Sequence, residues 1–404
     1  MVRVASIFSQ LLRHFPRTEF AALVRKHGAE RGAKGFTCWT QFVSMLFCQL
    51  ARADSLREIC HGLACCLGKL THLGIGKAPN KSTLSYANEH RPAALYEDLF
   101  WSALKRFRSS GILGTRKSPF RFKNQLLSLD STTISLCLAI FPWAKFRRAK
   151  GGVKVHVLLD HDDYMPSYAV ITEAKLHDVK VAPQLPLNPG SIVVMDRAYN
   201  DYELFGRWTE EGIFFVTRLK DNALYESFSE RDVPDSKKSH ILDDQMIELT
   251  SPSARKKCPH SLRLVVVWAA ELQRILVLLT NNFALAASTI SAIYKDRWQI
   301  ELFFKALKQN LKVKTFVGTS ENALRIQIWT ALLALLLIRW LHYLSQAGWS
   351  LSVLASMLRM NLFTYRDLEV WINDPFATPP LLPGIEQLDL PLRRLGQPSP
   401  ARRG

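Results

Sequence analysis

The amino-acid sequence predicts an α/β fold that carries a β-rich insertion and is preceded by a helical region. Two apolar runs, residues 125–130 and 191–196, each end in an aspartate, and residues 294–308 show a helical pattern with polar side chains on one side. Apolar runs of this length, rich in branched residues, suit interior strands of an α/β sheet. We expect three parts: a helical domain at 1–115, an α/β domain at 120–345 with the insertion at about 220–283, and a C-terminal helical segment with a flexible basic tail at 346–404.

The N-terminal region contains three helical stretches. Residues 39–50 and 55–63 repeat apolar side chains at helical spacing, and Ser55 suits an N-cap position. Residues 80–91 form a third helix, and its polar side chains suit contact with phosphates and base edges. The candidate DNA-binding face consists of Lys81, Ser82, Thr83, Ser85, Asn88 and Arg91. Two interpretations stay equally open, a helix-turn-helix-like DNA reader and a helical packing domain with an ordinary polar surface.

The α/β part begins with a predicted three-stranded meander. Residues 125–130, 152–159 and 166–172 form its strands, and the last two are antiparallel and joined through an acidic turn. We interpret the carboxylates of that turn as ordinary turn residues rather than metal ligands; they are Asp160, Asp162 and Asp163.

The gap between Asp196 and the helix at 294–308 is too long for one crossover helix. The strand-like run at 212–217 suits the last strand of the core sheet. Three further runs, separated by polar turns, predict the β-rich insertion; they are residues 245–250, 262–268 and 274–280.

The helix at 294–308 has two distinct sides. At roughly 100° per residue, its polar side holds Tyr294, Arg297, Glu301 and Lys308, with Trp298 nearby. Its apolar side holds Ile300, Phe303, Phe304, Leu307 and Leu311. A single carboxylate flanked by cations, a phenol and an indole suits a phosphate backbone held beside a metal ion. A surface helix with a solvated charged side is the alternative.

Asp130 and Asp196 supply two more carboxylates to the same predicted site. An aspartate at the carboxyl end of a strand points into the crevice where α/β sheets bind ligands, although it also commonly caps a following helix. Three clustered carboxylates repel one another, and divalent cations that serve phosphodiester chemistry relieve this repulsion. Zinc-ligand spacing, a Gly-rich phosphate loop and a nucleophile elbow are absent from the sequence, which removes competing chemistries.

Together these residues resemble the DDE transposases of bacterial insertion sequences, in the insertion-sequence-four group with its Tyr-x2-Arg-x3-Glu-x6-Lys signature. Tyr294, Arg297, Glu301 and Lys308 match that signature in full. Asp130 in Leu-Asp-Ser-Thr-Thr and Asp196 in Asp-Arg-Ala-Tyr look like the motifs around the family's two aspartates. The resemblance spans residues 122–340.

The resemblance implies a ribonuclease H-like catalytic domain with Asp130, Asp196 and Glu301 as a triad that binds two Mg²⁺ ions, for which Mn²⁺ can substitute. It also implies DNA contacts near the scissile phosphate from Tyr294, Arg297 and Lys308. To these we add Lys305 and Trp298, the latter stacking on an extruded base or, alternatively, belonging to the core.

Two further features of the resemblance concern neighbouring segments. In this family the insertion is associated with a hairpin at the transposon end. His177 and Asp178 resemble a His-Asp pair often seen at this place in the family, and a helix N-cap is the competing explanation for Asp178.

Composition agrees with a nucleic-acid partner. The chain of 404 residues has 53 Lys and Arg against 35 Asp and Glu, and its net charge of +18 favours a polyanion through counterion release. Seven cysteines, an odd count without a paired framework, suit a reducing cytoplasm. Zinc binding by Cys60 and His61 with Cys65 and Cys66 lacks paired ligand spacing, so buried thiols are favoured.

The most hydrophobic run, residues 328–338, ends before Arg339 and is shorter than the about 20 residues that a bilayer requires. We expect a core helix packed behind the helix at 294–308, no membrane partner and no signal peptide.

The predicted function is transposition, in which two protomers pair two DNA ends, bind terminal inverted repeats and target DNA, and cut and join strands in the bacterial cytoplasm. Two alternatives remain: a structure-selective nuclease of the same fold, and a transposase-derived repressor without catalysis. The intact triad and signature argue against the repressor.

Overall fold

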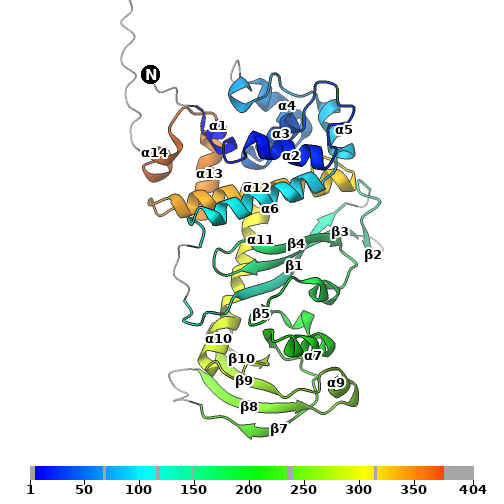
Figure 1. The fold of residues 1–404 in the computed structure, drawn as a ribbon, viewed down its shortest axis with the longest axis vertical. Helices are drawn as coiled ribbons and strands as arrows, with labels where there is room; N and C mark the ends of the chain where they lie inside the picture. The colour runs from blue at the N-terminus through cyan, green and yellow to red at the C-terminus, as the bar shows by residue number, and fades with distance from the viewer. Residues whose placement is uncertain are drawn as a thin grey trace, which may run out of the picture.

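Helices occupy one end of the computed structural model and strands the other, with the core sheet between them (Figure 1). The structure describes residues 5–66, 70–114, 119–137, 139–147, 150–233, 240–313 and 316–376. The N-terminal helices are α1 (Ile7–Leu12), α2 (Arg17–Lys26), α3 (Cys38–Ala51), α4 (Leu56–Ala64), α5 (Lys81–His90) and α6 (Ala94–Ser109). As predicted, Ser55 caps α4, because its side chain accepts a hydrogen bond from Glu58 N.

The core sheet has the strand order β4-β3-β1-β5-β6. Its strands are β1 (Leu126–Leu136), β3 (Lys150–Asp160), β4 (Pro166–Glu173), β5 (Ile192–Met195) and β6 (Phe214–Arg218), and the short β2 (Lys145–Arg147) also pairs with β3. β1, β3 and β4 are antiparallel neighbours, whereas β1, β5 and β6 are parallel. The predicted meander and the predicted interior strand at 191–196 are therefore confirmed, and the structure shows that this strand is parallel to its neighbours.

The insertion extends the core sheet instead of forming a second one. β10 (Arg274–Thr280) pairs antiparallel with β6, and the sheet continues through β9 (Leu262–Ala269), β8 (Ile241–Leu249) and β7 (Tyr225–Glu230). The three strands expected here are present, and β7 is an additional one. A short helix, α9 (Pro252–Lys257), lies between β8 and β9 and contacts α7 (Tyr202–Glu210) of the core.

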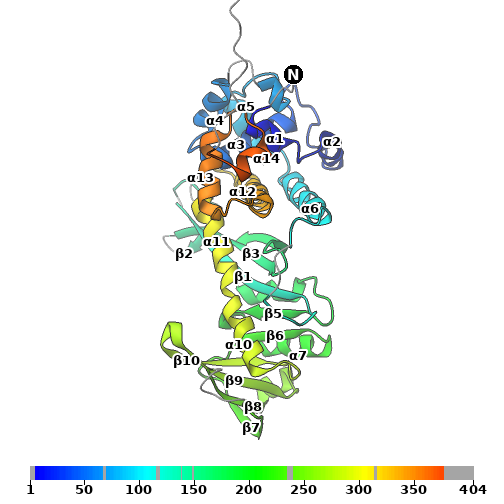
Figure 2. The same ribbon diagram turned by 90° about the vertical axis from the view of Figure 1, so that its left-hand side faces the viewer.

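The core sheet is covered on both faces, and strand alternation decides which residues face which helix. Val193 and Met195 of β5 pack with α7, whereas Ile192 and Val194 pack with α10 (Ala287–Asp296). Figure 2 shows α10 and α11 (Trp298–Asn310) running along the length of the molecule in front of the strands. Buried apolar side chains on both faces explain why the strands read as nearly continuous apolar runs.

The two ends of the chain form one helical unit. α12 (Glu321–Leu344) lies against α3, α5 and α6, and α13 (Leu351–Asn361) and α14 (Leu368–Asn373) complete the unit. Gln10 joins the two ends, since its side-chain amide donates to Arg366 O at 2.6 Å and accepts from Leu368 N at 2.9 Å. The expected boundary at 345 therefore does not separate two packing units, because α12 to α14 share their core with α1 to α6.

α12 differs from the expectation in length and in place. It continues through Arg339 to 24 residues, and by length and composition it is apolar enough to cross a membrane. However, 83% of its most apolar window is buried inside the protein. It contacts α11, as predicted, but it is mainly the central helix of the helical unit. Its apolarity is that of a core helix.

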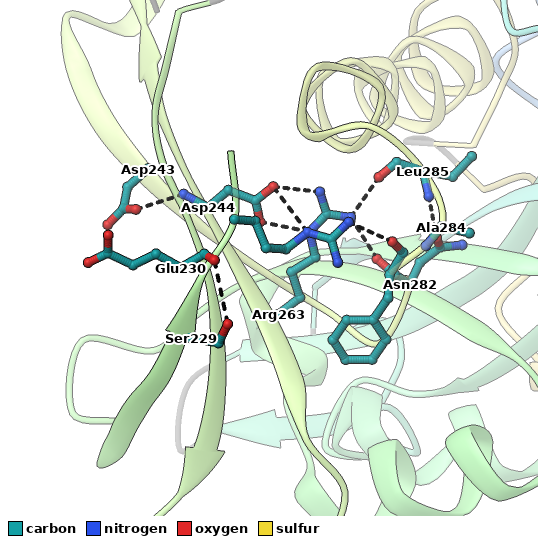
Figure 3. Close-up of polar contacts among 10 residues, drawn as sticks. Ser229, Glu230, Asp243, Asp244, Arg263, Asn282, Ala284 and Leu285 are labelled. Carbon is teal, nitrogen blue, oxygen red and sulfur yellow. Dashed lines mark hydrogen bonds and ion pairs between the residues drawn. The ribbon is translucent and has the colours of Figure 1, made fainter. Parts of the chain in front are cut away.

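A buried ion pair connects the insertion to the start of α10 (Figure 3). Arg263 of β9 and Asp244 of β8 are almost fully buried and form two hydrogen bonds of 2.8 and 2.7 Å. The remaining Arg263 nitrogen donates to the carbonyl oxygens of Asn282 and Leu285, in the segment that leads into α10. All three nitrogen atoms of this buried guanidinium group therefore donate hydrogen bonds, as burial of a charge requires.

Candidate active site

Strand register places Asp130 and Asp196 side by side. β1 and β5 are parallel neighbours, and Leu129 and Met195 are the last paired residues of the ladder. Asp130 and Asp196 are each the next residue of their chains. By alternation, both lie on the face that holds Leu126 and Val194, which is the face covered by α10. The first two predicted triad residues therefore meet at one edge of the sheet, on the face covered by α10, and the next helix, α11, contacts β1 and carries the third.

The predicted single helix at 294–308 is two helices with a junction at Arg297. α10 ends at Asp296 and α11 begins at Trp298. Ile300 N donates to Arg297 O at 3.2 Å, a three-residue spacing that tightens the turn as in a 3₁₀-helix. The expectation of one uninterrupted helix is therefore wrong, because the chain winds more tightly at this point than a regular 3.6-residue helix.

The two sides of α11 agree with the pattern nonetheless. The five apolar residues expected to face inward are all buried: Ile300, Phe303, Phe304, Leu307 and Leu311. Glu301 is half-buried, and Trp298 is 57% exposed. The core alternative for Trp298 is therefore wrong. Lys305 is exposed on the same stripe as Trp298 and Leu302, and it neighbours Glu301 one helical turn later.

Arg297 contacts two other residues on the polar side, Glu301 and Tyr294. Its guanidinium group donates to Glu301 Oε1 at 2.9 Å and lies 5.7 Å from the centre of the Tyr294 ring. Burial alone lowers the pKa of Arg297, but the neighbouring Tyr294, Glu301 and Asp130 raise it above its usual value. Arg297 Nε is buried and has no hydrogen-bond partner within the described part of the chain. This donor is the kind of group that a phosphate oxygen satisfies.

Lys308 connects α11 to the strand that carries Asp130. Its Nζ donates to Thr133 O of β1 at 3.1 Å. Three of the four signature residues, Tyr294, Arg297 and Glu301, thus gather around the helix junction, and the fourth lies farther along β1.

The pKa of Asp130 is raised from 3.8 to about 6. Burial is the largest cause, and the charges of Asp196 and Glu301 contribute to the same increase. A hydrogen bond from Ser131 N and the charge of Arg297 act in the opposite direction. The negative charges of Asp196 and Glu301 therefore disfavour ionisation of Asp130.

The three carboxylates suit a magnesium site by their chemistry, since oxygen donors and excess negative charge are what Mg²⁺ prefers. Their oxygen atoms are engaged by other groups of the protein and do not converge on one point. Asp196 accepts from Ala198 N at 3.0 Å as the cap of η4 (Arg197–Tyr199), and Glu301 is paired with Arg297. Across the described ranges, no three His, Cys, Asp or Glu side chains are close enough to hold a metal.

Asp178 lies beside the site through Ser131. The Ser131 hydroxyl donates to Asp178 Oδ1 at 2.8 Å, and Lys154 Nζ donates to the same oxygen at 3.0 Å. The residue at the N-cap of η2 (Asp178–Lys180) is His177, which forms no capping bond with its side chain. The N-cap explanation for Asp178 is therefore wrong, and its carboxylate is held among polar groups next to Asp130.

Sequence reasoning missed the other members of this group. His156 is fully buried, with its Nδ1 3.7 Å from Asp178, and burial lowers its pKa to about 4. Tyr199 is also buried, and burial together with Asp130 and Asp178 raises the pKa of its phenol. His156 is four residues before Asp160 on a strand interior, where a lone histidine carries no spacing signal.

The candidate DNA-binding face of α5 is divided by the structure. Lys81 and Ser82 are exposed, and Thr83 and Ser85 are half-buried. Asn88 is buried and accepts from Gln41 at 2.9 Å. Arg91 donates to Gln41 Oε1 and to the carbonyl oxygen of Phe36. Asn88 is therefore a packing residue of the helical unit, and its assignment to the DNA-binding face is wrong. Arg91 is half-buried, and its DNA contact stays a prediction.

The cysteine cluster shows no zinc site among the described residues. Cys60 and Cys66 are buried, and burial raises the pKa of the Cys60 thiol. Cys65 is exposed, so the buried-thiol interpretation holds for two of the three.

Two segments of the chain match known protein families. Residues 121–337 match the family described as "Transposase DDE domain", and residues 3–76 match a domain of unknown function, DUF4372. A putative transposase y4zB of Sinorhizobium fredii is 31% identical over 310 residues, which are 75% of this chain and 83% of that protein. A probable transposase for insertion sequence element IS5377 of Geobacillus stearothermophilus is 35% identical over 228 residues, 56% of this chain and 59% of that protein.

A solved structure of a piggyBac transposase synaptic complex with hairpin DNA is similar at a TM-score of 0.43 and 11% identity, covering 90% of this chain and 81% of that one. A likeness this low establishes neither fold nor function. The family match spans both strand-terminal aspartates and the signature helix, and the Sinorhizobium relative extends over most of both chains. The chain therefore belongs to the DDE transposases of insertion sequences, and it is an enzyme of DNA transposition.

Proposed function

We propose that this transposase binds the terminal inverted repeats of its insertion sequence and moves the element by Mg²⁺-dependent cleavage and strand transfer, with Asp130, Asp196 and Glu301 as the metal-binding triad. The observation that carries the proposal is the register of β1 and β5. It brings two aspartates from adjacent parallel strands to one edge, under the helix that bears Glu301. We further propose a ribonuclease H-like core, which the strand order β4-β3-β1-β5-β6 supports.

Each side chain near the triad has a distinct role in this proposal. When bound, two Mg²⁺ ions activate the attacking oxygen and stabilise the leaving one. Arg297 offers its unpartnered Nε to a phosphate oxygen, and Lys308 neutralises phosphate charge farther along β1. Trp298 is exposed beside the junction and stacks on a base displaced from the duplex.

We assign DNA binding outside the triad to the positive charge of the chain and to α5. The net charge of +18 favours DNA through counterion release, and the exposed Lys81 and Ser82 of α5 are the candidate contacts in the helical unit. Two protomers pair two ends in a homodimer, because an isologous pair matches the inverted symmetry of the repeats. The reaction takes place in the bacterial cytoplasm.

The test incubates purified protein with a labelled fragment of its own terminal repeat and a supercoiled plasmid, with Mg²⁺ or with chelator. We expect Mg²⁺-dependent cleavage and joining by the wild type, and none by Asp196→Ala or Glu301→Gln, although both variants bind the fragment. Asp232→Asn, an exposed carboxylate of the insertion, is the matched control and stays active. Full activity of Glu301→Gln contradicts the triad. Binding without cutting by the wild type supports a repressor, and cutting without joining supports a nuclease.

A further inference from the structure

A buried chain of hydrogen bonds connects the strand of Asp130 to the helix junction of Arg297. His161 lies at the turn after β3, and its Nε2 is 2.6 Å from the Ser128 hydroxyl of β1. On the other side of the ring, Nδ1 is 2.7 Å from Asp296 Oδ2. Asp296 is the last residue of α10, directly before Arg297. One imidazole ring therefore spans from the sheet to the end of the helix.

The direction of these bonds follows from donor chemistry. An ionised carboxylate only accepts, so Nδ1–H donates to Asp296, and Nε2 shares a hydrogen bond with the Ser128 hydroxyl. His161 is itself fixed to β1, because its backbone amide donates to Leu126 O at 3.0 Å. The other oxygen of Asp296 accepts from Gln299 Nε2 at 3.3 Å. His161 is thus bonded to β1 through its backbone as well as its ring, and Asp296 is bonded to Gln299 as well as to His161.

The distances match those of a Ser-His-Asp hydrolase triad, but burial excludes that chemistry. Ser128 is fully buried within β1 and is paired on both sides, with Leu159 of β3 and Val194 of β5. A nucleophile needs an open approach for its substrate. Ser128 has none, so the chain of bonds acts on the protein itself.

Its position relative to the triad indicates what it controls. Ser128 precedes Asp130 by two residues on the same face of β1, and Asp296 precedes the Arg297 that holds Glu301. The tightened turn at Arg297 lies directly after the residue that His161 holds. His161 therefore joins the two elements whose separation decides how far Glu301 lies from Asp130.

We propose that His161 is a positioning residue, which holds the α10–α11 junction on β1 through Ser128 and Asp296 and thereby sets the separation of Asp130 and Glu301 for divalent-metal binding. The proposal rests on the triad assigned above. Groups that orient metal ligands from outside are typically needed for affinity, and their loss costs about 10-fold to 100-fold.

The test measures Mn²⁺ binding to the purified full-length protein without DNA, by following the electron paramagnetic resonance signal of free Mn²⁺. His161→Phe keeps the ring and removes both bonds, and we expect at least about a 10-fold loss of affinity. Asp296→Asn keeps an acceptor but removes the negative charge that pairs with the ring, and we expect a loss of affinity smaller than that of His161→Phe but greater than two-fold. The matched control is His342→Phe, whose ring bonds Trp349 O in the helical unit and has no part in the bonds between Ser128, His161 and Asp296. We expect it to lower thermal stability without changing Mn²⁺ affinity.

The outcomes separate this proposal from the one on which it rests. If Glu301→Gln binds Mn²⁺ like the wild type, the triad assignment fails. If Glu301→Gln loses binding but folded His161→Phe and Asp296→Asn stay within two-fold of the wild type, the positioning role of His161 is overturned. Equal loss in His342→Phe also overturns it, because the effect would then be general destabilisation. Should His161→Phe not fold, Asp296→Asn alone decides between these results.

Discussion

Replacing Asp130 with Asn should stabilise the metal-free protein. Burial beside two other carboxylates raises the pKa of Asp130 from 3.8 to about 6. At 1.36 kcal/mol per pKa unit, the ionised carboxylate lowers the free energy of unfolding by about 3 kcal/mol at neutral pH. The cost is absent below the unfolded pKa, grows as pH rises and is complete above the folded pKa. Asn imitates the neutral acid, so Asp130→Asn removes the cost.

The assay is urea denaturation in chelator, with wild type and Asp130→Asn compared at several pH values. The gain of the variant should be about 3 kcal/mol at pH 7.5 and about 1 kcal/mol at pH 4.5. Adding Mg²⁺ should stabilise the wild type more than the variant, because the ion relieves the same repulsion. Asp232→Asn, an exposed carboxylate, serves as control and should show no gain. A variant that is no more stable than the wild type at pH 7.5 would refute this account of the site.

Three further changes test the surrounding structure. Arg263→Met should cost about 3–5 kcal/mol of unfolding free energy in urea denaturation, because buried Asp244 loses both hydrogen bonds from Arg263 and keeps only the more distant Arg231, at 3.7 Å. Adding Asp244→Leu should recover much of this loss, and no recovery would contradict the ion-pair argument. Gly206→Ala should lower the free energy of unfolding by about 1–3 kcal/mol, because the added methyl group meets the carbonyl oxygen of Lys257 where α7 contacts α9. An unchanged melting temperature would show that α9 can move away. Trp298→Ala should change the free energy of unfolding by less than about 0.5 kcal/mol, because the indole is exposed. The same variant should bind end DNA with unpaired bases more weakly in fluorescence anisotropy. A large loss of stability would argue for a packing role.

Much of the candidate site could be predicted from the sequence, because its residues stand in short patterns of neighbouring residues. An aspartate that ends an apolar run marks the edge of a sheet, and the apolar side of α11 follows from helical spacing alone. The cap at Ser55 and the strands of the insertion were likewise readable from neighbouring residues.

The rest depended on contacts between distant segments. Ser128, His161 and Asp296 come from a strand, a turn and a helix, and none of them stands in a recognisable spacing. The helix junction at Arg297 is invisible to a count of 100° per residue, which assumes a regular helix. Burial of Asn88 depends on α3, and the joining of both chain ends depends on Gln10, so neither is encoded within the helix it affects.

The pairing of β10 with β6 has a mechanical consequence. A hydrogen-bonded ladder between insertion and core leaves no flexible linker across which the two could swing independently. The outer strands are therefore held at a fixed distance from Asp130 and Asp196. The insertion and the core sheet move as one body, so any displacement of the outer strands is passed on to the sheet edge that carries both aspartates.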